Sequence, residues 1–200
     1  MQKKQYVRRL VMVALFGALS FVLMLFKFNV PILSPFADFD FSALPELLGG
    51  FILGPVDAIA IIILKILLKL VFQGTNSMFT GEITNVILSV AYVLPAVLYY
   101  RKNRTKKGAL IGIVIGTAAS IVVAIFTNIF ITFPFFMWLY GMSWDDILNT
   151  FSAINPWIKS IPTMVAFSVV PFNLVSRVVT SLITLLVYKR LSVPLKKFIQ

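Results

Sequence analysis

Several polar side chains lie inside or beside long apolar stretches, where they could bind a small ligand. Glu82, Asn85 and Asn128 interrupt segments that are otherwise largely apolar, and Lys159 stands just before the last of these segments. A carboxylate accepts hydrogen bonds, a carboxamide donates and accepts, and an ammonium group donates. Because polar groups in an apolar environment are costly without partners, we predict that these four residues line a binding site. The alternative is that they form hydrogen bonds between helices.

A second group of candidates alternates aromatic and polar side chains. It comprises Asp38, Phe39, Asp40, Phe41 and Ser42, and a later loop adds Trp157. Rings offer stacking area and a few polar groups fix orientation, so this pattern predicts a slot for a flat aromatic ligand. The alternative is that the rings dip into the lipid at a membrane interface.

The residue types that are absent exclude several classes of chemistry. The sequence has neither Cys nor His, which removes disulfides, thiolate nucleophiles and His metal sites. It also lacks the GxxxxGK[ST] loop that binds ATP phosphates. We therefore expect no enzyme, no metal and no cofactor, and the chain cannot hydrolyse ATP through such a loop.

The composition indicates a membrane protein. Apolar residues make up 60% of the chain and charged residues 12%, and the mean hydropathy is +0.96. We predict an all-α integral membrane protein in which residues 1–200 form a single domain with six transmembrane helices. The expected spans are about 8–27, 42–54, 56–72, 81–100, 108–133 and 161–189. Prolines and acids between 29 and 40 predict a loop there, and Ser143 is expected to cap a short interfacial helix over 144–154.

The distribution of charge predicts the orientation of the chain. The net charge is +11, and most cations precede the first span, lie in the segment 101–107, or follow the last span. In a membrane protein such loops face the cytoplasm, so both termini are expected there and no nucleic-acid partner is implied. The loops with Asp38, Asp40 and Lys159 then face outward.

Two small residues lie four apart in the first expected span. Ala14 and Ala18 share one helix face, which permits close approach of another helix. From the pattern alone, packing within the bundle is the simpler explanation.

Taken together, these residues resemble the substrate-binding S components of energy-coupling-factor (ECF) vitamin transporters, and most closely the riboflavin-specific ones. The resemblance covers nearly the whole chain. It is carried by Ala14 and Ala18, by the segment Asp40–Pro45 leading into Leu48–Pro55, and by Gly81-Glu82 before Asn85. It implies a bacterial cytoplasmic membrane protein that binds riboflavin at its outer face as the transported ligand. It also implies docking on a transmembrane T subunit with two ATP-binding subunits, with the alanine pair contacting the T subunit.

Other functions remain open at this stage. Thiamine is the second candidate vitamin, because an acidic outer mouth also suits a cation. A stand-alone secondary transporter is an alternative of another class, although such proteins usually carry an inverted repeat that this sequence lacks. A membrane enzyme or an assembly scaffold is not favoured, because no paired-carboxylate motif accompanies the absence of His and Cys.

Overall fold

The computed structural model describes residues 2–199 and is mostly helical. Its elements in chain order are α1 (Gln2–Leu25), β1 (Phe28–Val30), β2 (Ser34–Phe39), α2 (Ala43–Leu53), α3 (Pro55–Gln73), α4 (Thr80–Lys102), α5 (Lys106–Thr127), the π-helical segment η1 (Asn128–Thr132), α6 (Phe133–Tyr140), α7 (Trp144–Ile154), α8 (Ile161–Met164), the π-helical segment η2 (Val165–Val169) and α9 (Val170–Ile199). The two end residues of the expected domain, 1 and 200, lie outside the described range.

Four helical stretches are long and apolar enough to cross a membrane. They are Lys3–Leu25, Thr80–Lys102, Lys106–Tyr140 and Ile161–Tyr188. The helix that begins at Lys106 continues past the expected span end at 133, through η1 and α6 to Tyr140. Pro134 follows directly after the π-helical segment η1. The last of these stretches ends at Tyr188, one residue before the expected span end at 189, and the helical backbone continues to Ile199.

A turn at Gly54 separates α2 from α3, as the Gly-Pro pair predicts. Gly54 has a φ of 114°, which a residue with a side chain rarely adopts, and Pro55 opens α3 with its fixed φ. The short helix α2 is buried along most of its length and lies between α1, α3, α4 and α9. It is therefore surrounded by protein.

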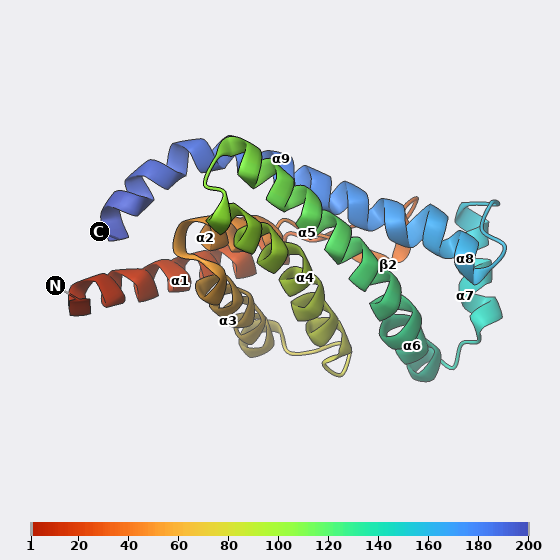
Figure 1. The fold of residues 1–200 in the computed structure, drawn as a ribbon. Coiled ribbons are helices and arrows are strands. Elements are labelled where there is room, and N and C mark those ends of the chain that lie inside the picture. The colour runs from red at the N-terminus through yellow and green to blue at the C-terminus, as the bar shows by residue number, and fades with distance from the viewer. Residues whose placement is uncertain (1, 200) are drawn as a thin grey trace.

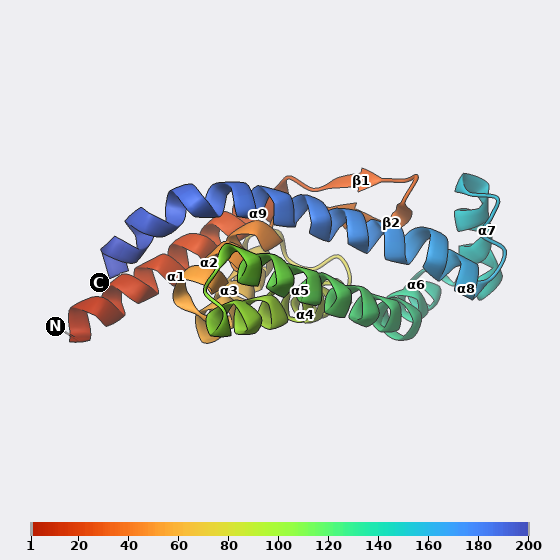
Figure 2. The ribbon, with the colours of Figure 1, turned by 45° about the horizontal axis from the view of Figure 1, so that its top comes forward.

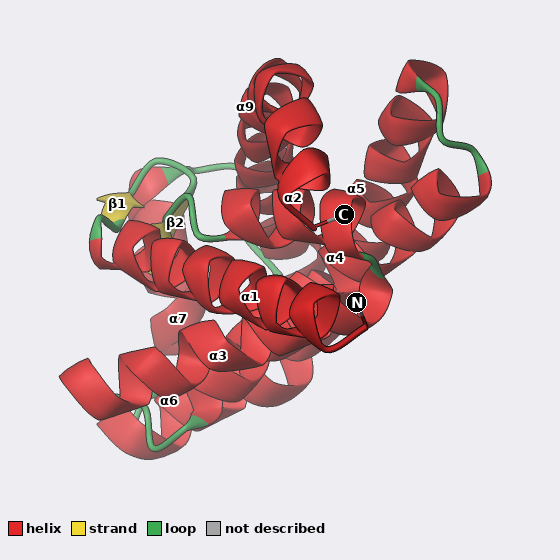
Figure 3. Ribbon diagram, turned by 90° about the vertical axis from the view of Figure 1, so that its left-hand side faces the viewer, coloured by secondary structure: helices red, strands yellow, loops and turns green. Residues whose placement is uncertain are grey.

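The segment after α1 is a hairpin, so the prediction of an irregular loop between 29 and 40 is wrong, while the chain is mostly helical as predicted. Strands β1 and β2 pair antiparallel, with Phe28 opposite Phe39 and Asn29 opposite Asp38. Phe39 is buried while Asp38 is exposed. Alternating aromatic and polar residues have the period of a strand, which places one kind of side chain on each face. Figure 3, with strands in yellow, shows how small this sheet is.

Helices α4 and α5 form the closest antiparallel pair of the bundle. A Cβ on Gly116 would lie 2.2 Å from the Tyr92 carbonyl oxygen, and one on Gly112 would lie 2.6 Å from the Ala96 carbonyl oxygen. Only glycine permits this approach of the two backbones, as the small residues of α5 predict.

The bundle has two distinct ends. The N-terminus of α1, the C-terminal part of α9 and the turn between α4 and α5 lie at the left in Figures 1 and 2. We call this the basic end, because the segment 101–107 supplies Arg101, Lys102, Arg104, Lys106 and Lys107 to it. The side chains of residues 189–194 and 196–199 lie outside the described part. Helices α6, α7 and α8 form the opposite end, which we call the far end.

Helix α7 confirms the helix expected over 144–154. The Ser143 hydroxyl accepts a hydrogen bond from the Asp146 N–H, and the Asp146 carboxylate accepts one from the Ser143 N–H at 2.7 Å. The Ser143 N–H and the Ser143 hydroxyl both donate to the Asp146 carboxylate, and these two bonds hold the pKa of Asp146 below its ordinary value. Ile147 and Phe151 are buried against protein, so the apolar face of α7 packs on the bundle.

Candidate functional site

A buried ion pair between α2 and α3 forms the centre of the first polar group. Glu46 Oε1 lies 2.5 Å from Lys65 Nζ, and both side chains have an exposed fraction of 0%. Neither helix alone provides both charges, so packing α2 on α3 creates the pair. Buried charges are tolerated when they are paired and hydrogen-bonded in this way.

Lys65 extends this pair into a network. Its Nζ donates to Asn85 Oδ1 at 2.6 Å and lies 3.3 Å from the hydroxyl oxygens of Ser42 and Ser89. Ser20 donates to the Ser42 carbonyl oxygen at 2.6 Å. We call Ser20, Ser42, Glu46, Lys65, Asn85 and Ser89 the buried polar cluster. It unites two predicted site residues, Ser42 and Asn85, through a lysine that was not among them.

One acceptor of the buried polar cluster has no partner. Glu46 Oε2 is buried and forms no hydrogen bond with the described residues. The nearby Arg177 donates from Nε to Ser120 Oγ at 3.0 Å and its guanidinium lies 4.8 Å from the centre of the Tyr92 ring. The interior of the bundle therefore holds cationic groups on α3 and α9 and one carboxylate oxygen that is free to accept.

Glu82 belongs to a second polar group, at the connection between α3 and α4. Its carboxylate pairs with Lys69 and accepts hydrogen bonds from the hydroxyls of Thr75, at 3.1 Å, and Ser77, at 2.9 Å. Lys69 also donates to the Gly74 carbonyl oxygen at 2.7 Å. These bonds hold the connection closed, so Glu82 has local partners there.

The hairpin segment holds the other predicted acids and rings. Lys27 donates to Asp38 at 2.7 Å in an exposed ion pair, and Asp40 accepts from the Ser42 N–H at 2.7 Å. The Phe39 ring packs on Phe28 and Phe41, with ring centres 5.1 and 5.3 Å apart. Phe39 and Phe41 therefore pack on each other in the folded hairpin, as adjacent members of one aromatic group.

Phe36 links the hairpin to the far end of the bundle. Its ring centre lies 5.5 Å from Phe136 and from Phe151, and 6.4 Å from Phe133. The Ser168 hydroxyl of η2 donates to the Leu33 carbonyl oxygen. The hairpin thus folds back over the bundle, and this arrangement is needed for the predicted residues of the hairpin and of the helices to converge. We call Phe36, Phe133, Phe136 and Phe151 the aromatic cluster; the sequence offered only a run of phenylalanines as its signal.

The remaining predicted residues lie toward the far end. Asn128 opens η1 and donates to the Ala124 carbonyl oxygen at 2.8 Å. Trp157 is 73% exposed, and its ring centre lies 6.4 Å from that of Phe167. Lys159 is exposed, and its ammonium group forms no ion pair with any residue that the structure describes. π-helical segments such as η1 and η2 often occur at functional sites, and nothing in the sequence indicates them.

One apolar core brings these separate groups into the same region. Phe36, Leu88, Ile125 and Ile161 all pack against the core built around Phe133 and Phe151. Four predicted residues lie within three positions of them along the chain, namely Asp38, Asn85, Asn128 and Lys159. The candidate site is therefore the region bordered by the hairpin, α4, η1 and α8. It combines aromatic surface with amide, carboxylate and ammonium groups.

Ala14 and Ala18 lie on the exposed face of α1. Met12, Val13 and Phe16 on the other face are buried against the bundle. The alanine pair therefore does not pack inside this chain, which contradicts the simpler explanation that the pattern suggested. An exposed stripe of small residues leaves room for a helix of another subunit.

Comparison with known proteins gives consistent results over the whole chain. The sequence profile of the family described as ECF transporter, substrate-specific component, matches residues 8–188. The riboflavin transporter RibU of Staphylococcus aureus (strain TCH60) is 31% identical over 192 residues, which cover 95% of this chain and 93% of that protein. The riboflavin transporter FmnP of Bacillus subtilis (strain 168) is 27% identical, with 92% of each chain covered.

The fold also matches a solved structure. A chain described as the S component of a bacterial ECF transporter superposes with a TM-score of 0.73 at 29% identity. The match covers 98% of this chain and 99% of that one, so the two chains share their fold over nearly their whole length.

Proposed function

The chain belongs to the family of substrate-specific S components of ECF transporters, and we propose that it is the riboflavin-binding subunit of such a transporter. One observation carries the proposal. Relatives that match more than nine-tenths of the chain are named riboflavin transporters, and the match extends along their whole length as well. The S component binds the vitamin and has no ATP-binding loop of its own. It works with a transmembrane T subunit and two ATP-binding subunits, which supply the energy.

The protein resides in the bacterial cell membrane as a multi-pass chain. Six crossings require α2 and α3 to lie in the membrane beside the four long apolar stretches. Helix α3 has 19 residues, enough for about 28 Å at a rise of about 1.5 Å per residue. Its three charged residues are all paired: Asp57 with Arg9, Lys65 with Glu46 and Lys69 with Glu82. Pairing lowers the cost of placing α3 in lipid.

The position of the ends supports an even number of crossings. Both ends of the chain and the turn between α4 and α5 lie at the basic end (Figure 2). By the rule that cationic loops stay inside, this end faces the cytoplasm and the far end faces outward. Residues 1–200 then form one membrane domain with its vitamin site at the outer side.

Riboflavin has two parts that match the two kinds of surface in the candidate site. Its isoalloxazine is a flat tricycle with an amide-like edge, and its ribityl chain is an uncharged polyol. The hairpin rings and the exposed Trp157 offer stacking, while Asn85 and Asn128 offer both donor and acceptor to the edge. Asp38, Asp40, Ser42 and Lys159 are suited to the hydroxyl groups. Glu82 contributes by holding the connection before α4 in place.

The charges of the site favour a neutral vitamin over thiamine. Asp38 pairs with Lys27, Glu82 pairs with Lys69, and Asp40 accepts from the Ser42 N–H. Each of these carboxylates already has a partner in the described part of the chain. Its charge therefore attracts a cationic ligand less, while its remaining lone pairs can still accept hydrogen bonds from ligand hydroxyls. A secondary transporter is not favoured either, because the family profile spans nearly the whole chain.

The absorption spectrum of the purified full-length protein tests the proposal. Flavin bound from the expression host should give the yellow absorption of oxidised isoalloxazine, and denaturation should release it. Calorimetric titration of the flavin-free protein should then show sub-micromolar riboflavin binding and no thiamine binding. Tight thiamine binding without a response to riboflavin would reassign the vitamin.

A further inference from the structure

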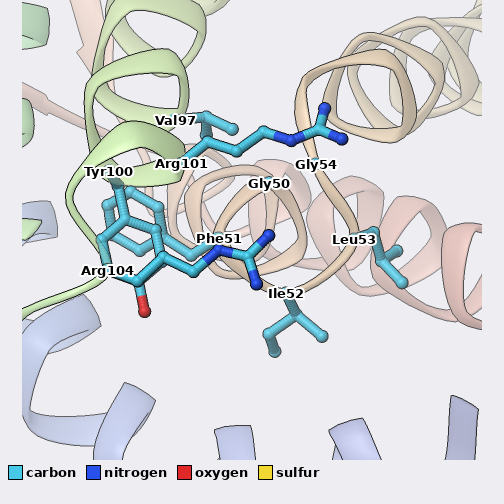
Figure 4. A pocket seen from close by; sticks show the side chains of 9 residues that line it. All are labelled: Gly50, Phe51, Ile52, Leu53, Gly54, Val97, Tyr100, Arg101 and Arg104. Carbon is cyan, nitrogen blue, oxygen red and sulfur yellow. The ribbon is translucent and has the colours of Figure 1, made fainter. Parts of the chain in front are cut away.

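A hollow at the basic end, distant from the vitamin site, is bordered by two arginines. It lies between the α2–α3 turn at Gly54 and the C-terminal turn of α4, and its cavity volume is about 100 Å³. Arg101 and Arg104 both extend over it, and their guanidinium groups lie above the chain between Phe51 and Gly54 (Figure 4). The guanidinium of Arg101 would lie 3.6 Å from a Cβ built on Gly54, an ordinary van der Waals contact, so Arg101 lies directly against this turn.

The two guanidinium groups have no anionic partner in the described part of the chain. Neither arginine forms an ion pair or hydrogen bond with a described residue. Asp57, the carboxylate nearest in sequence to Gly54, is already bound by Arg9 at 2.5 Å. The hydroxyl of Tyr100, which also lines the hollow, is bonded to the hydroxyl of Tyr188. The donors of Arg101 and Arg104 are therefore free for an external acceptor.

The ends of α2 and α4 explain positive charge here only in part. The C-terminus of a helix attracts cations, and both helices end beside the hollow. The attraction of a helix C-terminus for cations does not explain why the site is concave or why two guanidinium groups extend over it. Arginine binds phosphate oxygens in a bidentate manner, which makes paired guanidinium groups suited to a phosphate.

Apolar side chains form the smaller part of the border, beside the charged groups. Ile52 and Leu53 line the hollow as half-buried side chains that also pack against the core around Phe16, and Val97 is buried. A free phosphate ion would gain nothing from these side chains, whereas a phospholipid places acyl carbons directly beside its phosphate. The hollow also lies where the apolar helices end and the cationic segment begins, which is the depth of lipid headgroups.

We propose that this hollow binds the phosphate group of an anionic glycerophospholipid, with Arg101 and Arg104 as its ligands and Ile52 and Leu53 against the proximal acyl carbons. Basic pockets between membrane helices recognise lipid headgroups by this chemistry. The lipid would hold the α2–α3 turn against the end of α4, so its binding stabilises the bundle at the basic end. The proposal requires only that the chain lies in a membrane and does not depend on which vitamin is bound.

Native mass spectrometry of the full-length protein in detergent tests the site. The protein is mixed with equal amounts of phosphatidylglycerol and phosphatidylcholine, and the retained lipid is measured. We expect preferential retention of phosphatidylglycerol, reduced roughly tenfold or more in Arg101→Gln/Arg104→Gln because charge-assisted hydrogen bonds are lost. The matched control is Lys106→Gln/Lys107→Gln, which removes the same charge from the same segment outside the hollow and should retain the lipid.

The other outcomes are equally distinct. Equal loss in both double variants would mean diffuse attraction and would overturn the proposal. Displacement of the lipid by inorganic phosphate at a concentration comparable to that of the lipid would identify a free anion site and would refute the proposal. Loss of T-subunit copurification in Arg101→Gln/Arg104→Gln with unchanged lipid would identify a protein contact and would also refute it. Circular dichroism checks folding, and Arg101→Lys/Arg104→Lys, which keeps the charge without the forked donors, should retain part of the lipid.

Discussion

The buried pair of Glu46 and Lys65 allows the sharpest test of how the bundle is stabilised. Lys65→Met removes the ammonium group while keeping a similar length and shape. It leaves the Glu46 carboxylate uncompensated at a position with no solvent exposure, and it leaves Asn85 Oδ1 without its donor. We expect a large loss of stability from this single change. Glu46→Gln/Lys65→Met replaces both charges and should recover much of the loss.

The magnitude follows from the burial of the pair. Removing one partner of a buried ion pair typically costs about 3–5 kcal/mol, whereas replacing both is often close to neutral. The double variant still leaves Asn85 without the lysine donor, which adds a cost of about 1–3 kcal/mol for an unsatisfied buried group. For a chain of this length, the single change corresponds to a fall in the midpoint of thermal unfolding of roughly 6–20 °C.

Thermal unfolding in detergent, followed by circular dichroism at one scan rate, measures these differences. Lys27→Gln serves as the control, because it breaks the pair with Asp38 at 2.7 Å, in which the side chains are 55% and 41% exposed. An exposed pair contributes about 0–1 kcal/mol, so this variant should unfold near the wild-type temperature. Riboflavin affinity of Lys65→Met should fall as well, since Lys65 holds Asn85 at 2.6 Å.

The reasoning is refuted if Lys65→Met is as stable as Lys27→Gln. It is also refuted if the double variant loses as much stability as Lys65→Met and Glu46→Gln lose together, because the two charges would then not be coupled. In that case the stability of α2 would come from its apolar contacts alone.

Further predictions concern binding, docking and a helix end. Asn128→Ala and Lys159→Ala should each weaken riboflavin binding by about 1–3 kcal/mol in calorimetric titration, because a polar group of the ligand loses its partner; unchanged affinity in both would move the site. Ala14→Leu should leave riboflavin affinity intact but abolish uptake and T-subunit copurification. Ala118→Leu, the same change at an exposed position of α5, should leave affinity, uptake and copurification unchanged. Normal uptake in Ala14→Leu would contradict docking through this face of α1. Ser143→Ala should speed hydrogen exchange in α7 by the loss of about 1 kcal/mol of capping, and unaltered exchange would show that packing alone holds this helix.

Local signals in the sequence were sufficient for most of the elements. The turn at Gly54, the cap at Ser143 and the long apolar stretches were all predicted at nearly the right residues, because each depends on neighbours within a few positions. The hairpin was missed although its aromatic and polar residues alternate with the period of a strand. Its prolines dominated the interpretation, since they exclude a helix and are equally compatible with a loop or an edge strand.

The partners of the polar residues depended on the tertiary structure. The sequence determined that Lys65, Glu82 and Asn85 need polar partners, because each lies in an otherwise apolar helix. Only the packing of α2, α3 and α4 decided that Lys65 meets Glu46 and Asn85, and that Glu82 is bound by Lys69. The physical reason is the distance along the chain over which each effect acts. Helix propensity, capping and hydropathy depend on neighbours within one or two helical turns. A hydrogen bond between helices requires two backbones that are distant in sequence to pack with the two side chains at the same level and facing each other.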